Sequence, residues 1–208
     1  LGTAWAAGSQ GGGPSGPPGP PSGSVPLGPD AGEDVGAYLT RIRAGLPPPG
    51  VPVLALVQFG DALTGADALA GAAGSTTVTA VFQVQLPRVQ TALAFEDLEP
   101  RVPTATALAS AQARAASAAA RRAGAGTRRQ RAIATAERVA LADPACACVI
   151  ALVVRGDRAA LEAVAARPGV RAVQAAPAGV TRAELALSPL LPAQTTRAVP
   201  LPDDGQVP

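Results

Sequence analysis

Two cysteines separated by one residue, Cys146 and Cys148, are the only thiols of this chain and its sharpest chemical feature. Residues i and i+2 of a strand face the same way, about 6.6 Å apart. That distance is near the upper limit for a disulfide, so a bond needs a local turn, which Pro144 favours. The pair can form a local disulfide, remain as two unpaired thiols, or act as a redox or metal-binding pair. A structural zinc site would need ligands from another chain, so we expect no metal.

Arginines gather around an expected turn between two helices, and residues 100–136 contain seven arginines and no acid. One interpretation is an anion-binding site for phospholipid headgroups or acidic polymers of a cell envelope. The alternative is a solvated face that keeps an alanine-rich hairpin soluble. No aromatic residues are interleaved, so we expect no nucleic-acid partner. The candidate residues are Arg121, Arg122, Arg128, Arg129 and Arg131.

Other charged motifs have simpler explanations. The tripeptide Arg155-Gly156-Asp157 matches an integrin-binding sequence, but it falls where a strand must turn and a helix must be capped. The acids at 96–99 and at 203–204 could serve acid-base chemistry or calcium binding, yet no supporting ligands accompany them. We interpret both groups as solvated loop acids.

Composition argues against an enzyme. The 208 residues include no histidine, which removes the commonest general base and metal ligand at neutral pH. Aromatic residues make up 2% and methionine is absent, so the core must depend on valine and leucine. We expect no catalytic residues and no cofactor.

The N-terminal part favours a tether. Residues 1–8 are small and apolar with Trp5 among them, which resembles the outer end of a membrane helix. The sequence therefore predicts an anchoring helix before residue 1 and a location in the cell envelope, on the extracytoplasmic side of the plasma membrane. Residues 1–32, rich in Gly, Pro and Ser, are expected to form a disordered membrane-proximal linker.

Periodicity then predicts two β-α-β units. A short helix at about 33–44 precedes a buried strand at 51–59, a helix capped by Asp61, and a strand at 76–86. The second unit has a strand at 149–154, a helix to about 167 and a strand at 170–175.

A repeat connects the units, because 55–61 and 151–157 are identical at five of seven positions, including the Gly-Asp pair. Between the units, 88–103 is expected to be irregular, and 104–142 to form a helical hairpin broken at Gly124-Ala-Gly126, with Thr127 capping its second helix.

Two such units predict an α+β fold of the ferredoxin-like split β-α-β type, with a four-stranded antiparallel sheet and the hairpin as an insertion. A Rossmann-type sheet is the alternative, but it needs more strands and a G-x-G-x-x-G motif that is missing. The domain is expected to span 33–191, followed by an extended Pro-rich tail at 192–208.

Several motifs together resemble a family: the run from Cys146 to Asp157, then Pro-Gly-Val-Arg-Ala-Val, and the Leu-Leu-Pro-x-Gln-Thr segment at 190–195. The chain is similar over 51–208 to an uncharacterised family of extracytoplasmic domains in single-pass membrane proteins from high-GC actinobacteria. Residues 161–173 also resemble the helix-Pro-Gly-Val-strand end of subtilisin-type propeptides.

The family resemblance implies no particular activity. The long N-terminal linker and the helical insertion favour a non-enzymatic sensor or interaction domain of a membrane-anchored protein, with an unknown protein partner or an anionic envelope surface. The alternative is a propeptide-like inhibitor or chaperone of a serine protease, whose extended tail would enter the active site.

Overall fold

The two most continuous apolar runs of the chain form neighbouring strands. In the computed structural model, which describes residues 23–208, β2 (Val53–Leu63) pairs antiparallel with β5 (Val149–Gly156). Residues 53–59 and 149–154 are all buried, as expected for strands covered on both faces. These two strands carry most of the hydrophobic core.

The main sheet has five strands in the order β4-β3-β5-β2-β6, and all its pairings are antiparallel. The remaining members are β3 (Thr76–Phe82), β4 (Ala94–Asp97) and β6 (Val170–Ala175). The predicted α+β class and antiparallel sheet are confirmed, but the prediction of four strands is wrong. The extra strand, β4, lies in the segment expected to be irregular and bonds to the outer edge of β3.

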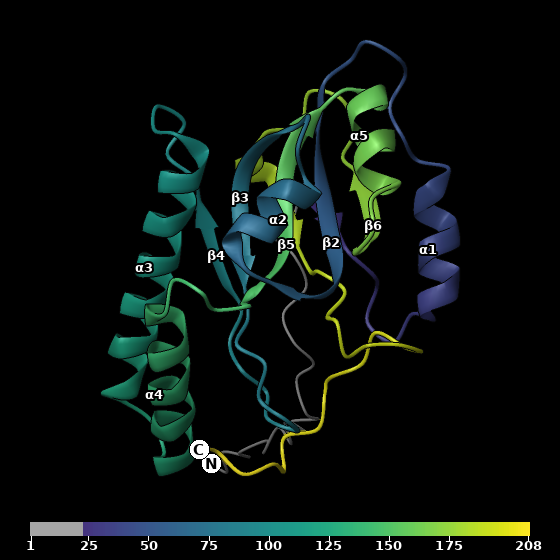
Figure 1. Cartoon of the computed structure of the whole chain (residues 1–208). Coiled ribbons are helices and arrows are strands. Elements are labelled where there is room, and N and C mark those ends of the chain that lie inside the picture. Colours follow the sequence, from purple (N-terminus) through teal and green to yellow (C-terminus); the bar gives the residue numbers. More distant parts are fainter. Residues whose placement is uncertain (1–22) are drawn as a thin grey trace, which may run out of the picture.

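Helices cover one face of this sheet (Figure 1). Short helix α2 (Gly65–Gly71) lies in front of β3 and β5, and α5 (Arg158–Ala165) lies nearer β6. Helix α3 (Thr104–Ala123) packs beside α2, and α4 (Arg128–Ala142) pairs with α3. The predicted hairpin is therefore confirmed, and its turn ends where Thr127 and Gln130 form a reciprocal capping box.

The opposite face is covered by a two-stranded parallel ribbon of β1 (Val25–Leu27) and β7 (Leu185–Leu187), preceded by the short 3₁₀-helix Arg182–Glu184. Leu27 is buried against the sheet. The linker predicted for 1–32 therefore extends too far, since β1 lies within it. The rest of that linker and the region next to the expected membrane anchor lie outside the described residues.

Helix α1 (Val35–Arg43) confirms the helix predicted at about 33–44, and it packs on the edge strand β6. A buried polar network attaches it. The Gln58 amide donates to the Tyr38 hydroxyl at 2.7 Å, and this hydroxyl donates to Gln174 Oε1 at 2.9 Å. The Leu190 amide donates to Gln58 Oε1 at 2.6 Å. Burial raises the pKa of Tyr38 to about 12. The network joins α1, β2, β6 and the C-terminal segment.

The two copies of the repeat fold differently. Asp157 caps α5 as predicted, accepting from the Ala160 amide at 2.9 Å. Asp61 does not cap a helix, because β2 continues through it to Leu63 and Thr64 is the cap of α2. A register shift in the β2–β5 pairing after Gln58 accommodates the longer strand.

Candidate functional site

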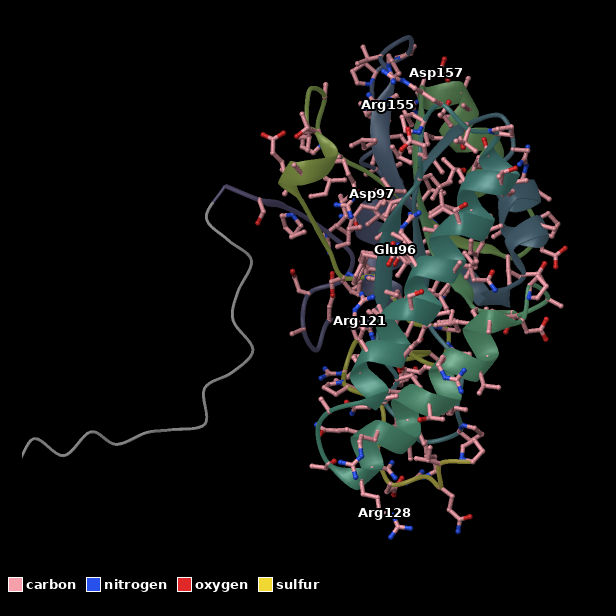
Figure 2. The ribbon with its side chains drawn as sticks, turned by 90° about the vertical axis from the view of Figure 1, so that its left-hand side faces the viewer. Glu96, Asp97, Arg121, Arg128, Arg155 and Asp157 are labelled. Carbon is pink, nitrogen blue, oxygen red and sulfur yellow. A yellow bond between two sulfur atoms is a disulfide. The ribbon has the colours of Figure 1, made fainter. Side chains whose placement is uncertain are left out.

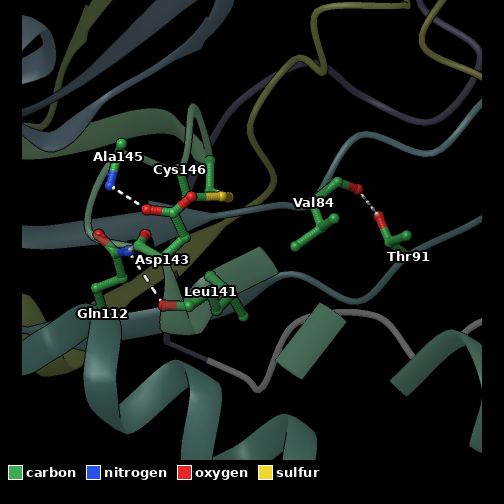
Figure 3. The surroundings of a disulfide bond; sticks show 8 residues. Val84, Thr91, Gln112, Leu141, Asp143, Ala145 and Cys146 are labelled. Carbon is green, nitrogen blue, oxygen red and sulfur yellow. Dashed lines mark hydrogen bonds between the residues drawn. A yellow bond between two sulfur atoms is a disulfide. The ribbon is translucent and has the colours of Figure 1, made fainter. Parts of the chain in front are cut away.

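The segment between α4 and β5 makes a tight turn that carries both cysteines (Figure 3). The Asp143 carboxylate accepts from the Ala145 amide at 2.9 Å, and the Asp143 carbonyl accepts from the Cys146 amide at 3.0 Å. The turn brings the Cα atoms of Cys146 and Cys148 to 5.3 Å, and the structure joins the two sulfur atoms as a disulfide. The local turn that such a bond requires is therefore present.

The two cysteines differ in their surroundings. Cys146 is half-buried at the margin of the core, whereas Cys148 is only 2% exposed. The Cys148 carbonyl accepts from the Gln83 amide at 2.8 Å, which fixes the position just before β5 begins. A reagent in solvent therefore meets Cys146 first.

Gln112 on α3 holds the C-terminal end of α4. Its amide nitrogen donates to the Leu141 carbonyl at 3.1 Å and to the Asp143 carbonyl at 2.7 Å. The last carbonyls of a helix have no partner within that helix, so this buried side chain supplies one. The role of Gln112 could not be recognised from the sequence, because only its position on the buried face of α3 distinguishes it from an ordinary helix-surface glutamine.

The disulfide closes a very small loop. In the chain-entropy model, a loop of about three residues stabilises a fold by about 1.6 kcal/mol, compared with about 3 kcal/mol for a loop of 15 residues. The sequence separation of two therefore makes this a weak stabiliser by that mechanism. Gln112 and the start of β5 hold the same turn by hydrogen bonds.

Beside this turn lies an apolar groove of about 470 Å³, which we name the hairpin groove. Alanines and glycine on α2, α3 and α4 leave space between the helices that larger side chains would fill. The groove reaches Pro144, two residues before Cys146. Its lining residues are Gly65, Ala66, Leu69, Ala105, Leu108, Ala109, Gln112, Ala113, Ala116, Leu141, Ala142 and Pro144.

At the other end of the hairpin, the predicted arginine cluster is largely used within the chain. Glu137 is only 2% exposed, and its carboxylate accepts from Arg122 Nη2 and from the Ala92 amide, both at 2.6 Å. A second cavity of about 480 Å³ is lined by both Arg122 and Glu137. Because the buried carboxylate faces this cavity, its charge opposes the binding of an anion there.

Arg129 holds the C-terminal tail. Its guanidinium donates to the Asp203 carboxylate at 3.0 Å and to the Gly205 carbonyl at 2.9 Å. Arg88 binds Asp204 in the same way, with Nε 2.7 Å from Oδ1. The hydrogen bond from Arg129 lowers the pKa of Asp203, and that from Arg88 lowers the pKa of Asp204. The acids expected to be solvated therefore anchor the end of the tail.

The remaining predicted arginines do not converge. Arg131 donates to the Gly126 carbonyl at 2.6 Å and closes the hairpin turn. Arg121 and Arg128 are exposed, and their side chains make no hydrogen bond within residues 23–208. Arg128 projects from the turn of the hairpin, and Arg121 lies on α3 (Figure 2). The structure therefore does not bring the five arginines together as one site.

The other charged motifs also have structural partners. Glu96 binds Arg114 at 2.8 Å, and the Asp97 carboxylate accepts from Thr79 at 2.7 Å and from Arg182 at 3.0 Å. Arg155 and Asp157 lie at the end of β5 and the start of α5 (Figure 2), where Asp157 is the helix cap. The contacts of Glu96 and Asp97 attach β4 to α3 and to the segment before β7.

In the described part of the chain, no group of three or more Cys, Asp or Glu residues could hold a metal ion. No helix among residues 23–208 is both long and apolar enough to cross a membrane. Comparison of the chain with protein-family models, with curated proteins and with solved structures found no match.

Proposed function

We propose that this chain is a non-enzymatic sensor or interaction domain, anchored by a helix before residue 1 on the extracytoplasmic side of the plasma membrane. The observation that carries the proposal is the hairpin groove, whose apolar walls would be covered by an apolar segment of a partner protein. In the part of the chain that the structure describes, no charged side chain lines the groove, so apolar contact is the main attraction available there.

The proposed fold assignment is ferredoxin-like. The order β3-β5-β2-β6 interleaves the two β-α-β units, so that the strands of each unit are separated by a strand of the other. Under this assignment, β4 is an addition at the edge and α3–α4 is an insertion. The hairpin groove then lies between the insertion and the first unit's helix, α2.

Site-specific photo-crosslinking in the cells that produce the protein tests the groove. We expect a photoreactive amino acid at Ala109, which lines the groove, to give a discrete adduct with one partner. The same amino acid at Ala120, which is exposed on α3 outside the groove, should give none. In the Ala109 protein, an added Ala113→Glu should abolish the adduct, whereas equal adducts from both positions would contradict the proposal.

Localisation is a separate test. The full-length protein should sediment with membranes, and externally added protease should degrade this domain in intact cells. Recovery in the soluble fraction of lysed cells would contradict the proposed anchor.

A propeptide-like role receives less support. An inhibitory tail must be free to enter a protease, but Arg88 and Arg129 bind this tail, and Arg171 donates to the Leu191 carbonyl at 3.2 Å and the Gln194 carbonyl at 2.6 Å. Incubation with a subtilisin is expected to cleave the chain without loss of protease activity. Inhibition at equimolar ratio would favour the propeptide role over the proposal.

A further inference from the structure

We infer that the Cys146–Cys148 disulfide is a thiol-disulfide exchange site that reacts with a dithiol of a partner protein. This inference deepens the proposed function, because it names the signal that the domain senses. It depends on three features of the described residues: the size of the disulfide loop, the unequal exposure of the two cysteines and the position of the hairpin groove.

The fold does not depend on this disulfide for its architecture. The bond joins residues two positions apart, so it links no distant parts of the chain. The same turn is held by the Asp143 carboxylate, by the Gln112 side chain and by the bond from the Gln83 amide to the Cys148 carbonyl. A bond that contributes little to the unfolding free energy can be opened and closed while the domain stays folded.

The unequal exposure assigns a role to each sulfur. A thiolate of the partner attacks Sγ of half-buried Cys146, since Cys148 is nearly inaccessible. A bond forms between the partner's sulfur and Cys146, the Cys146–Cys148 bond breaks, and Cys148 leaves as a thiolate.

The partner's second thiolate then attacks the partner's sulfur atom in the mixed disulfide. This closes the partner's own disulfide and releases Cys146 as a thiolate. Two electrons pass to the cysteines, the partner dithiol becomes a disulfide, and its two protons end on Cys146 and Cys148 or in solvent.

The hairpin groove selects which dithiol protein can react, and it makes partner binding depend on the redox state. Pro144 and Leu141 line the hairpin groove and flank the Asp143 turn that holds the cysteines. An apolar segment bound in the groove would therefore present its thiols next to Cys146. Opening the disulfide frees the Cys146 side chain while the hydrogen bonds keep the backbone of the turn in place. The surface beside Pro144, and hence the affinity for the partner, therefore changes with the redox state.

The first experiment compares reduction of the native and unfolded full chain by dithiothreitol, followed by alkylation and mass measurement. We expect the native disulfide to be reduced within about ten-fold of the rate in urea, because the half-buried Cys146 can be attacked without unfolding. A native disulfide that survives conditions that reduce the unfolded chain would overturn the inference. Two free thiols in protein never exposed to reductant would also overturn it.

The second experiment assigns the attacked sulfur. In Cys148→Ser, the remaining thiol of Cys146 should react with an aromatic disulfide reagent about 100-fold faster than the thiol of Cys148 in Cys146→Ser, since accessibility limits the rate. Comparable rates in the two folded variants would overturn the assignment of Cys146 as the site of attack.

The third experiment separates exchange from groove binding, using an apolar peptide with two cysteines and dithiothreitol as alternative reductants. We expect Ala113→Glu to slow reduction by the peptide about ten-fold and to leave reduction by dithiothreitol unchanged, because only the peptide needs the groove. The matched control Ala120→Glu should change neither rate.

These outcomes distinguish the two claims. Equal rates with the peptide in both glutamate variants would overturn the groove's role and the proposed function with it. A disulfide inert to both reductants would overturn the exchange inference alone. The crosslinking experiment would still test whether the groove binds a partner.

Discussion

The two ends of the α3–α4 hairpin are fastened by different chemistry. At the cysteine end, the neutral Gln112 side chain holds the C-terminus of α4, and the disulfide closes the turn that follows it. At the turn end, salt bridges hold the hairpin: Glu137 pairs with Arg122, and Arg129 pairs with Asp203 of the tail. The difference teaches that one end can respond to reductant and the other to pH and salt, although the same two helices connect them.

The largest effect should come from the turn end. Glu137→Leu is expected to lower the free energy of unfolding by about 3 kcal/mol, because it leaves Arg122 and the Ala92 amide without their acceptor. Urea unfolding followed by circular dichroism measures the change. The matched control is Glu162→Leu, which removes an exposed carboxylate paired with Arg158 and should cost less than about 0.5 kcal/mol. Similar losses in both variants would contradict a special role for Glu137.

The next effect should come from the cysteine end. Gln112→Leu keeps an apolar volume but leaves the Leu141 carbonyl without a donor and the Asp143 carbonyl with the Cys146 amide alone, so we expect a loss of about 2 kcal/mol. Reductant should destabilise Gln112→Leu further and by more than it destabilises Glu137→Leu, because Gln112 and the disulfide hold the same turn. An equal effect of reductant on the two variants would contradict the claim that Gln112 and the disulfide hold the same turn.

A third effect should be confined to the tail and should depend on pH. The folded-state pKa values of Asp203 and Asp204 are lowered from 3.8 by their arginine partners, so the docked tail is favoured above pH 3.8 and is lost as the pH falls through the lowered values. Backbone ¹⁵N relaxation of Gly205 should therefore show rapid motion only in strong acid. The double variant Asp203→Asn/Asp204→Asn should show that motion at pH 7, with no change at Cys146; a rigid Gly205 in this variant would contradict the prediction.

The smallest effect concerns membranes. Only Arg121 and Arg128 of the predicted anion site lack partners in the described residues, and each arginine near an anionic surface contributes about 1 kcal/mol. Sedimentation with anionic and neutral vesicles should therefore reveal weak binding to the anionic vesicles alone. That binding should be lost in Arg121→Gln/Arg128→Gln. If binding depended on Arg122 and Arg129 instead, the assignment of those two arginines to internal contacts would be wrong.

Local patterns were sufficient to predict most of the helices and the central strands. The hairpin followed from its alanine content and the Gly124–Gly126 break, and α1 and α5 from capping acids before apolar stripes. Asp61 shows where such inference ends, because the same Ala-Leu-Val-x-x-Gly-Asp sequence ends a strand at Asp157 but continues one at Asp61. Pairing with distant strands, rather than the local sequence, decides between these outcomes.

The missed elements share a physical cause. Strands β1, β4 and β7 have three or four residues each, too few for a period of two to be recognised, and each gains its hydrogen bonds from a distant segment. Glu137 and Gln112 looked like ordinary residues of exposed helix faces, since burial depends on tertiary packing. Of the candidate site, the cysteine turn could be predicted, whereas the groove and the division of the arginines could not.

The long separation between β2 and its partners has a consequence for the order of folding during synthesis. Among residues 23–208, strand β2 pairs only with β5 and β6, which leave the ribosome after the whole α3–α4 hairpin. The hairpin depends on contacts close in sequence and should form early. At that stage the apolar residues 53–59 have no strand to pair with. During that interval the nascent chain exposes a strand that can aggregate, and we expect chaperone binding to be strongest until β5 emerges.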